Sequence, residues 1–256
     1  MKGFSAFLKK EFLELWRTSE LIILGIIFAL FGIMNPAIAK LTPWLVKMSA
    51  DAFKSQGMVI SEVKVTAFDS WTQFVKNMPV ALIVLLIMFS GIFTKEYSKG
   101  TLIPILTKGL SRKTVVISKT VAMFMVWSAC FWLSFGITCG YTAFYWDISV
   151  VKNIGFMAFC WWLMGIFLIC IHTFFSSFAN TAPQVMVGTG ISYVIMYIMG
   201  MIGKIKEFLP TYILDSSSIM TAKSKPGDYT VAIFITFSLS VLTLLCSLPL
   251  SQKKQL

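Results

Sequence analysis

The chain has 256 residues, of which 57% are hydrophobic and only 13% charged, about half the charged share of a soluble domain. Its apolar residues form long runs instead of alternating, which excludes a membrane β-barrel and predicts an all-α membrane protein. The net charge of +11 comes from basic residues spread over short loops without a nucleic-acid-binding motif, so we expect no nucleic-acid partner.

The first 18 residues predict an amphipathic helix. Its basic side chains, including Lys9, Lys10 and Arg17, lie largely on one side, and Glu11 interrupts the other. That other side is apolar and consists of Phe4, Phe7, Leu8, Phe12, Leu15 and Trp16. Two compatible interpretations stay open: the helix lies on the membrane surface, or it docks on a partner. Glu11 favours docking, because a lipid anchor needs no acid on its apolar face.

Six apolar runs are predicted to cross the bilayer as helices. They comprise residues 21–39, 79–93, 121–141, 154–175, 185–202 and 231–250, and residues 71–76 can extend the short second run. Ala37-Ile38-Ala39 resembles a signal-peptide cleavage site, but about 20 residues with three glutamates precede the run, so we expect the first span to be retained. Five basic residues among residues 95–113 give the highest density of positive charge, which places that segment and both termini in the cytoplasm.

Two outer segments are expected to carry further structure. Residues 40–77, between the first two spans, are predicted to contain short helices. Residues 204–229 include an apolar stretch that is too short to cross, which predicts a re-entrant or interfacial helical insertion before the last span. Because no internal repeat or low-complexity stretch is found, we interpret residues 1–256 as one transmembrane domain.

Residues that could power transport or catalysis are missing from the sequence. No acid lies in any predicted span, and neither a phosphate-binding loop nor a protease motif occurs. His172 is interpreted as a packing residue near a span end, and the five cysteines fall inside spans without metal-ligand spacing. We therefore expect no enzymatic activity, cofactor or metal in this chain, and an outside energy source if it moves a substrate uphill.

The segment between the second and third spans is the most informative part of the chain. It reads Glu96-Tyr-Ser-Lys-Gly-Thr-Leu102, then Leu106-Thr-Lys-Gly-Leu-Ser-Arg-Lys113, then Ser118-Lys119. Leu102, Ile105 and Leu106 form an apolar stripe at helical spacing, which a plain connector does not need. One interpretation is a helix held by a cytoplasmic partner. The other is a surface loop whose lysines only set the topology.

This pattern resembles the loop after the second span of ABC-2 type permeases, which have the type V exporter fold. An acid, then Gly-Thr-Leu, a short apolar helix, a Ser-Arg turn and a lysine opening the third span occur in the same order. The N-terminal helix, the six spans and the insertion before the last span agree with that family's layout. Among such permeases, the chain is similar to those that export amphipathic peptides such as phenol-soluble modulins or lantibiotics.

The resemblance implies half of a transporter in a bacterial plasma membrane. Two copies, expected as a homodimer, would pair with two separately encoded ATP-binding subunits, which would hold ATP and Mg²⁺. Residues 95–113 would form the coupling region, and residues 1–18 the connecting helix beside it. The residues implied to contact the ATP-binding subunit are Glu96, Lys99, Gly100, Leu102, Ile105, Leu106 and Arg112.

The family's substrate path runs between the second and fifth spans. On these helices the resemblance points to Met88, Phe89, Tyr193, Met196 and Tyr197, an adaptable surface suited to hydrophobic or amphipathic cargo. One alternative is a non-transporting scaffold or sensor that recruits a cytoplasmic partner through the same loop. Another is an ion-exporting permease or ion-coupled carrier, which the lack of intramembrane acids disfavours.

Overall fold

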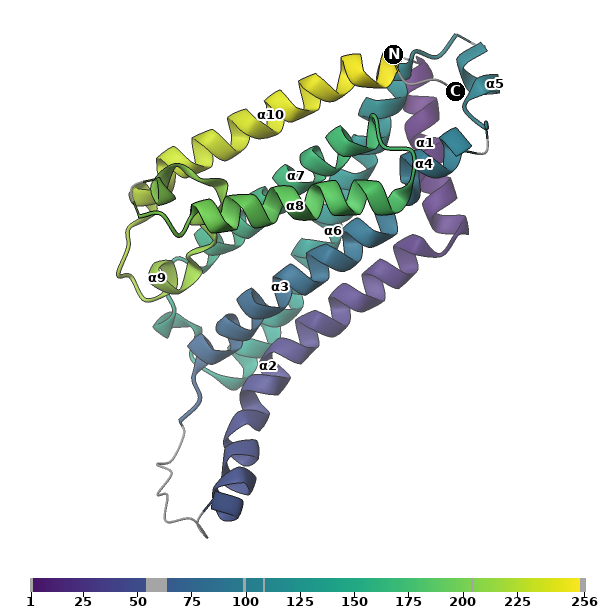
Figure 1. The fold of residues 1–256 in the computed structure, drawn as a ribbon. Coiled ribbons are helices and arrows are strands. Elements are labelled where there is room, and N and C mark those ends of the chain that lie inside the picture. The colour runs from purple at the N-terminus through teal and green to yellow at the C-terminus, as the bar shows by residue number, and fades with distance from the viewer. Residues whose placement is uncertain (1, 54–63, 99, 108, 204, 254–256) are drawn as a thin grey trace.

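The computed structural model describes residues 2–53, 64–98, 100–107, 109–203 and 205–253, and within them every regular element is helical. Long helices lie side by side in a bundle, and the two chain ends lie at the same end of it (Figure 1). The helices are α1 (Lys2–Arg17), α2 (Glu20–Phe53), α3 (Ala67–Phe89), α4 (Gly91–Ser98), α5 (Ile103–Thr107), α6 (Arg112–Tyr145), α7 (Ile154–Ser176), α8 (Ala182–Met199), α9 (Ser216–Met220) and α10 (Thr230–Lys253).

Six helical segments among the described residues are long and apolar enough to cross a membrane, which confirms the predicted all-α fold with six spans. In lipid, only helices and closed barrels satisfy their own backbone hydrogen bonds, so the long apolar runs form helices. The segments cover Glu20–Met48, Ala67–Tyr97, Arg112–Tyr145, Ile154–Ser176, Ala182–Met199 and Pro226–Gln252.

The second span begins at Ala67, before both residue 79, where the sequence places its apolar run, and residue 71, where the predicted extension begins. Judged by hydropathy alone, polar residues such as Ser70 and Asn77 interrupt the apolar run and shorten the predicted span. In the structure both are satisfied by neighbouring helices. Ser70 Oγ lies 2.7 Å from Thr142 Oγ1, and the Asn77 amide donates to Asn35 Oδ1 at 2.7 Å. Because buried polar groups are tolerated once hydrogen-bonded, the helix extends through them.

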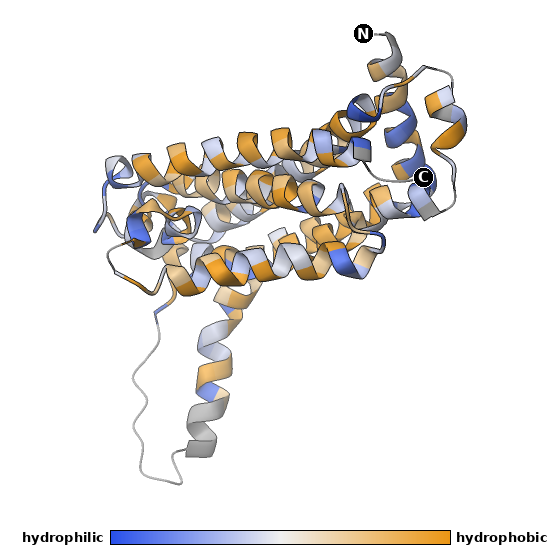
Figure 2. Cartoon of the chain, turned by 45° about the horizontal axis from the view of Figure 1, so that its top comes forward, coloured by the Kyte–Doolittle hydropathy of each residue, from blue (hydrophilic) through white to orange (hydrophobic). Residues whose placement is uncertain are grey.

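The sequence predicts separate short helices in the outer segment 40–77, but its described residues, 40–53 and 64–77, contain none. Instead, α2 continues through much of it to Phe53, with Pro36 and Pro43 inside the helix. The end of α2 projects from the bundle (Figure 2). At 1.5 Å per residue the 34 residues of α2 measure about 51 Å, well beyond the roughly 30 Å of a hydrocarbon core. Its end therefore reaches past the apolar part of the bilayer.

The longer spans include four acids that the sequence analysis placed outside them: Glu20, Asp69, Glu96 and Asp228. Asp69 lies in the first turn of α3, where its carboxylate accepts the Thr66 N–H at 2.8 Å. Glu96 lies at the opposite end of the same span, in α4. Glu20 and Asp228 lie in the first turn of their spans. All four acids are thus near span ends, and the middle of the described spans still holds no carboxylate.

The helix α7 is the most buried span and α8 the least, with 67% and 11% of their most apolar windows buried. Close contact between α6 and α7 depends on Gly165, because a Cβ there would lie 2.2 Å from the Trp127 ring. The indole N–H of Trp127 donates to the Trp162 carbonyl oxygen at 3.0 Å. The centre of the bundle is therefore tightly fixed, whereas α8 lies at its edge.

His172 packs inside the bundle, as the sequence analysis expects, whereas two of the five cysteines, Cys139 and Cys246, are not buried. His172 is fully buried in α7, and its Nδ1 lies 3.3 Å from Thr189 Oγ1 of α8. All five cysteines are free, and three of them, Cys130, Cys160 and Cys170, are buried in the bundle.

The insertion before the last span is helical, as the sequence predicts, and its described residues form a series of short helical turns. Ile213 and Tyr229 are buried, and the Tyr212 and Tyr229 rings stack with centroids 4.8 Å apart. The segment packs against α7 and α10 and closes the end of the bundle opposite the termini (Figure 1). Its turns are Lys206–Phe208, Pro210–Leu214, α9 and Pro226–Tyr229.

Candidate functional site

The segment between the second and third spans turns through two glycines. Gly100 (φ +64°) and Gly109 (φ +91°) lie on either side of α5, in a backbone region that other residues rarely adopt. They set off the five-residue α5 from α4 and α6. At the start of α6, the Ser111 hydroxyl oxygen accepts the Thr114 N–H at 3.1 Å and caps the helix.

A buried lysine lies where α1, α4 and α6 meet. Only 1% of the Lys119 side chain is exposed. Its Nζ lies 2.9 Å from Glu11 Oε2 of α1 and 3.0 Å from Glu96 Oε2 of α4. A buried charge without a partner would cost several kcal/mol, so these two carboxylates are what make the position of Lys119 stable. One side chain thus joins three helices.

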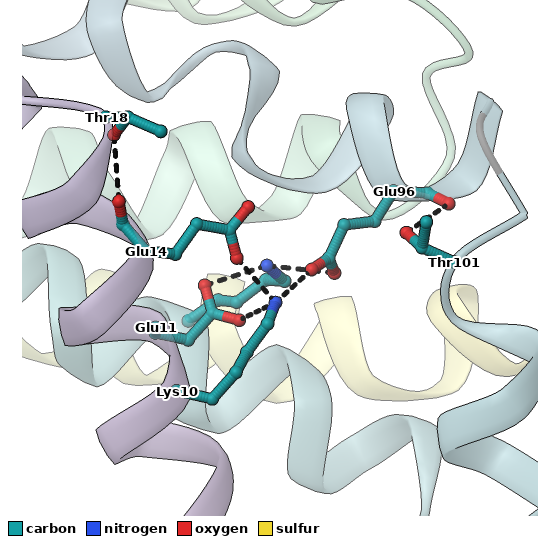
Figure 3. A network of polar contacts seen from close by, with 7 residues as sticks. Lys10, Glu11, Glu14, Thr18, Glu96 and Thr101 are labelled. Carbon is teal, nitrogen blue, oxygen red and sulfur yellow. Dashed lines mark hydrogen bonds and ion pairs between the residues drawn. The ribbon is translucent and has the colours of Figure 1, made fainter.

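A second lysine lies among the same acids (Figure 3). Lys10 Nζ lies 3.0 Å from Glu11 Oε1 and 2.7 Å from Glu14 Oε2, and it also pairs with Glu96. Burial alone would lower the pKa of Lys10, but hydrogen bonds to Glu14 and Glu96 outweigh it and raise the pKa above its ordinary value. Burial likewise opposes ionisation of Glu14, yet its bond with Lys10 lowers the pKa of that carboxyl. Both groups are therefore charged near neutral pH.

We call Lys10, Glu11, Glu14, Glu96 and Lys119 the charged cluster. Carboxylate oxygens of its three acids lie within 4.8 Å of one another, a spacing that a metal ion could use. Here the two ammonium groups already supply positive charge at short distances. The acids are therefore explained by ion pairing between helices, and we assign no metal to them.

A cavity of about 480 Å³ lies beside the charged cluster. The residues of the charged cluster form part of its wall. The rest of the wall consists of polar residues, Thr18, Glu20, Lys95 and Thr101, and of apolar side chains such as Met88. Charged and hydroxyl groups on the wall suit water and disfavour a hydrocarbon chain. The cluster is therefore buried on its helix-facing side and borders a polar space on the other.

The short helix α5 is attached to the bundle by Leu102, the residue just before it. Leu102 is 2% exposed and packs with Phe7 of α1 and Val115 of α6. On the outer side of α5, Ile103 is 48% exposed and Thr107 is exposed as well. The helix thus has one face fixed to α1 and α6, and another that is open to a partner.

Comparison with known proteins agrees with this arrangement. Residues 5–246 match the sequence profile of the ABC-2 family transporter proteins, which is nearly the whole chain. The chain belongs to this family. No curated protein is similar enough to count as a relative. Together, the family match and the six apolar spans make the ABC-2 protein a multi-pass membrane protein.

Several residues implied to contact an ATP-binding subunit lie inside the ABC-2 protein. Glu96 is 7% exposed and ion-paired in the charged cluster, and Leu102 is packed on Phe7. Leu106 is half-buried and packs against the same cluster, which Leu102 forms with Phe7 and Val115. In contrast, the exposed Ile103 did not stand out in the sequence, because a five-residue helix is too short for periodicity to show which side faces inward.

The remaining implied contact residues are placed as follows. Arg112 donates to the carbonyl oxygens of Ser251 and Gln252, at 3.5 and 3.1 Å, and so joins the start of α6 to the end of α10. Such a contact suits a cation near a helix C-terminus, where carbonyl groups lack helical partners. Gly100 forms the turn before α5. Lys99 and the side chain of Ile105 lie outside the described residues.

The apolar side of α1 is divided between the bundle and its surroundings. Phe7 and Leu15 are buried together with Glu11, whereas Trp16 is 61% exposed. The residues between these extremes are half-buried: Phe4, Leu8 and Phe12. Glu11, which interrupts the apolar side in the sequence, is thus the residue that attaches α1 to Lys119. The location of α1 at the membrane surface stays a prediction.

The residues expected along a substrate path do not share one surface within the chain. Phe89 is fully buried, and Met88 lines the polar cavity. Tyr193 lines a separate apolar groove of about 240 Å³ between α3, α7 and α8. Met196 is half-buried, and Tyr197 is 59% exposed. Of these five residues, Tyr193 alone therefore reaches that groove.

Proposed function

We propose that this ABC-2 protein is the transmembrane subunit of an ATP-driven exporter in a bacterial plasma membrane. Two copies, expected as a homodimer, pair with two ATP-binding subunits that hold ATP and Mg²⁺ and carry out hydrolysis. The chain itself is then not an enzyme, and both of its termini face the cytoplasm. Membership of a transporter family supports this role.

The observation that carries the proposal is the attachment of α5 to α1 and to two spans. The outer side of α5, with Ile103 and Thr107, offers a small, partly apolar surface to an ATP-binding subunit. Movement of α5 acts on α1, because Leu102 packs on Phe7. It then acts on the second and third spans through the charged cluster, which joins α1 to α4 and α6 as one unit.

The proposed substrate is hydrophobic or amphipathic: a peptide toxin, an antimicrobial peptide or a drug-like molecule. The middle of the described spans holds no carboxylate that could bind an ion, and the groove lined by Tyr193 is almost wholly apolar. These features support apolar cargo over ion export. The proposed path lies between two copies, so both copies contribute residues to its wall.

The test is co-purification with a cognate ATP-binding subunit, followed by ATPase measurements in proteoliposomes. Ile103→Glu is expected to remove both binding and stimulated hydrolysis, because it places a charge without a partner in an apolar contact. Val150→Glu is the matched control. Val150 is 61% exposed but lies beyond the far end of α6. An ATP-binding subunit that binds equally well to a chain lacking residues 101–107 would contradict the proposal.

The same preparation separates export from the scaffold or sensor function. Export predicts ATP-dependent accumulation of a labelled amphipathic peptide inside inverted vesicles. Binding of the ATP-binding subunit without any such accumulation, over a panel of cationic and anionic amphipathic peptides, would favour the scaffold. ATP-dependent movement of an ion in place of peptide would favour the ion exporter.

A further inference from the structure

The face that the last span, α10, turns toward the bundle consists of small side chains. Its buried residues, among those that the structure describes, are Ala232, Thr236, Ser240, Ser247 and Ser251. Only 22% of the most apolar window of this span is buried, against 67% for α7. Small side chains allow α10 to lie close to α6 and α7 without large side chains that lock it in one position.

The hydroxyls on this face are satisfied within α10. Thr236 donates to the Ala232 carbonyl oxygen at 2.6 Å, and Ser240, Ser247 and Ser251 donate in the same way at 2.6 to 2.8 Å. A thiol contact from Cys170 to Ser240 adds only a weak bond to a neighbouring helix. A face of this kind allows the small sliding movements by which packed helices shear.

The cytoplasmic end of α10 is held in a different way. Arg112 donates to the Ser251 and Gln252 carbonyl oxygens, at 3.5 and 3.1 Å. The last carbonyl groups of a helix lack helical partners and form the negative end of its dipole, so a bond from a guanidinium to them is charge-assisted. The length of α10 therefore rests on a smooth surface, whereas its end is fixed by a directed bond.

Arg112 is also the first residue after the segment that contains α5. The helix α5 ends at Thr107, Gly109 turns the chain with φ +91°, and Ser111 caps α6 at the residue before Arg112. Because residues 108–111 alone separate α5 from Arg112, a displacement of α5 reaches this side chain directly. Figure 1 shows the end of α10 at the same end of the bundle as α1 and α5.

The direction of the Arg112 side chain distinguishes it from the neighbouring cation. Lys113 is exposed, whereas Arg112 is half-buried and turns its guanidinium to α10. A basic residue of the same helix often caps a helix C-terminus. Here the cap comes from the first turn of α6, so it joins two spans that meet beside α5.

We propose that Arg112 is a positioning residue that ties the sixth span to α5, so that α10 slides with α5 when an ATP-binding subunit moves it. The proposal rests on the export function proposed above. The charged cluster joins α1 to α4 and α6, and thus to the second and third spans. Arg112 adds the sixth span, whose smooth face permits the movement.

The first test measures amphipathic peptide transported per ATP hydrolysed, in proteoliposomes with the cognate ATP-binding subunit. Arg112→Gln should lower this ratio at least about fivefold, because the charge-assisted bond is lost. Binding of the ATP-binding subunit and its hydrolysis rate should stay within about twofold, since the exposed side of α5 is unchanged. Arg112→Lys keeps a cation and should restore at least about half of the ratio. Lys113→Gln, at the exposed neighbour, should have no effect on it.

The second test reads the contact in the full chain without an ATP-binding subunit. Hydrogen exchange at the amides of residues 250–253 should become at least about threefold faster in Arg112→Gln, because the end of α10 frays without its cation. Exchange in α7 should stay unchanged, which shows that the variant folds. Lys113→Gln should change neither region.

Each contrary result identifies a different failure. Loss of binding of the ATP-binding subunit in Arg112→Gln would place Arg112 in that interface and overturn the inward role. Faster exchange with an unchanged transport ratio would make Arg112 a helix cap only. If the unchanged chain neither binds an ATP-binding subunit nor exports, the proposed function itself fails. If it exports and Arg112→Gln exports equally well per ATP, this inference alone fails.

Discussion

Two cavities of this ABC-2 protein differ in almost every property. The one beside the charged cluster lies near the termini, and acids, lysines and threonines stand in its wall beside a few apolar side chains. The groove between α3, α7 and α8 lies farther along the bundle and is walled almost wholly by apolar side chains. One continuous span, Ala67–Tyr97, contributes to both, with Glu96 in the first and residues 79–86 in the second. A tilt of that span changes both cavities together, which links the charged end to the apolar groove without a separate relay.

The largest expected effect breaks the charged end. Lys119→Met removes the buried one of the two cations that Glu11 and Glu96 share and leaves them only the half-exposed Lys10, so we expect a loss of about 3–5 kcal/mol in the free energy of unfolding. Unfolding in mixed micelles measures it. Lys113→Met, an exposed lysine on the same helix, should change little. Equal effects of the two changes would mean that the charged cluster does not hold the helices together.

The next effect distinguishes the buried side of the segment formed by Leu102 and α5 from its exposed side. Leu102→Ala removes the side chain that packs on Phe7 and should cost about 2–3 kcal/mol of unfolding free energy, because a cavity is left behind. Ile103→Ala should leave that free energy nearly unchanged while weakening binding of an ATP-binding subunit. If Ile103→Ala cost more unfolding free energy than Leu102→Ala, then Ile103, and not Leu102, would be the side chain that packs on the bundle.

Two glycines sharpen the difference between the tight core and the open groove. Gly165→Ala puts a Cβ 2.2 Å from Trp127 and should cost about 1–3 kcal/mol through forced repacking of α6 and α7. Gly190→Ala meets nothing and should be neutral or slightly stabilising. Thermal unfolding of the two variants measures the difference. Similar midpoints would show that α6 and α7 separate more easily than their contact indicates.

The smallest effect is the pH dependence of α1. The pKa of Glu14 is lowered from 4.5, so its contribution to docking is present above that value and is lost as pH falls through the lowered pKa. The pKa of Lys10 is raised from 10.5, so its contribution is complete below that value and is lost only at still higher pH. Protease cleavage within α1 should therefore be flat between about pH 5 and 10. A step near pH 7 would require another titrating group.

The sequence predicted the number and approximate position of the spans, because long apolar runs have few alternatives in lipid. It also placed the glycines that isolate α5. It allowed the second span to extend back to residue 71 but not to the start of α3 at Ala67, because the polar Ser70 and Asn77 acquire their partners only when the helices pack. Hydropathy counts side chains one at a time and does not detect such pairs.

The charged cluster shows the same limit more clearly. Glu11 and Lys119 are 108 positions apart, and nothing in the local pattern of either residue indicates the other. The family resemblance identified Glu96 as important but gave it an outward role, whereas the structure buries it between two lysines. The one available signal was that Glu11, Glu96 and Lys119 carry opposite charges on three predicted helices. Several other lysines could have been paired with the same two acids.

The distance of 108 positions between Glu11 and Lys119 has a consequence for biosynthesis. At about 5–20 residues per second, the ribosome makes Lys119 roughly 5–20 s after Glu11. During that interval α1 has left the ribosome, but the cation that holds its buried face does not yet exist. A nascent chain arrested before the third span should therefore leave α1 open to added protease, and α1 should become protected only once the third span has been made.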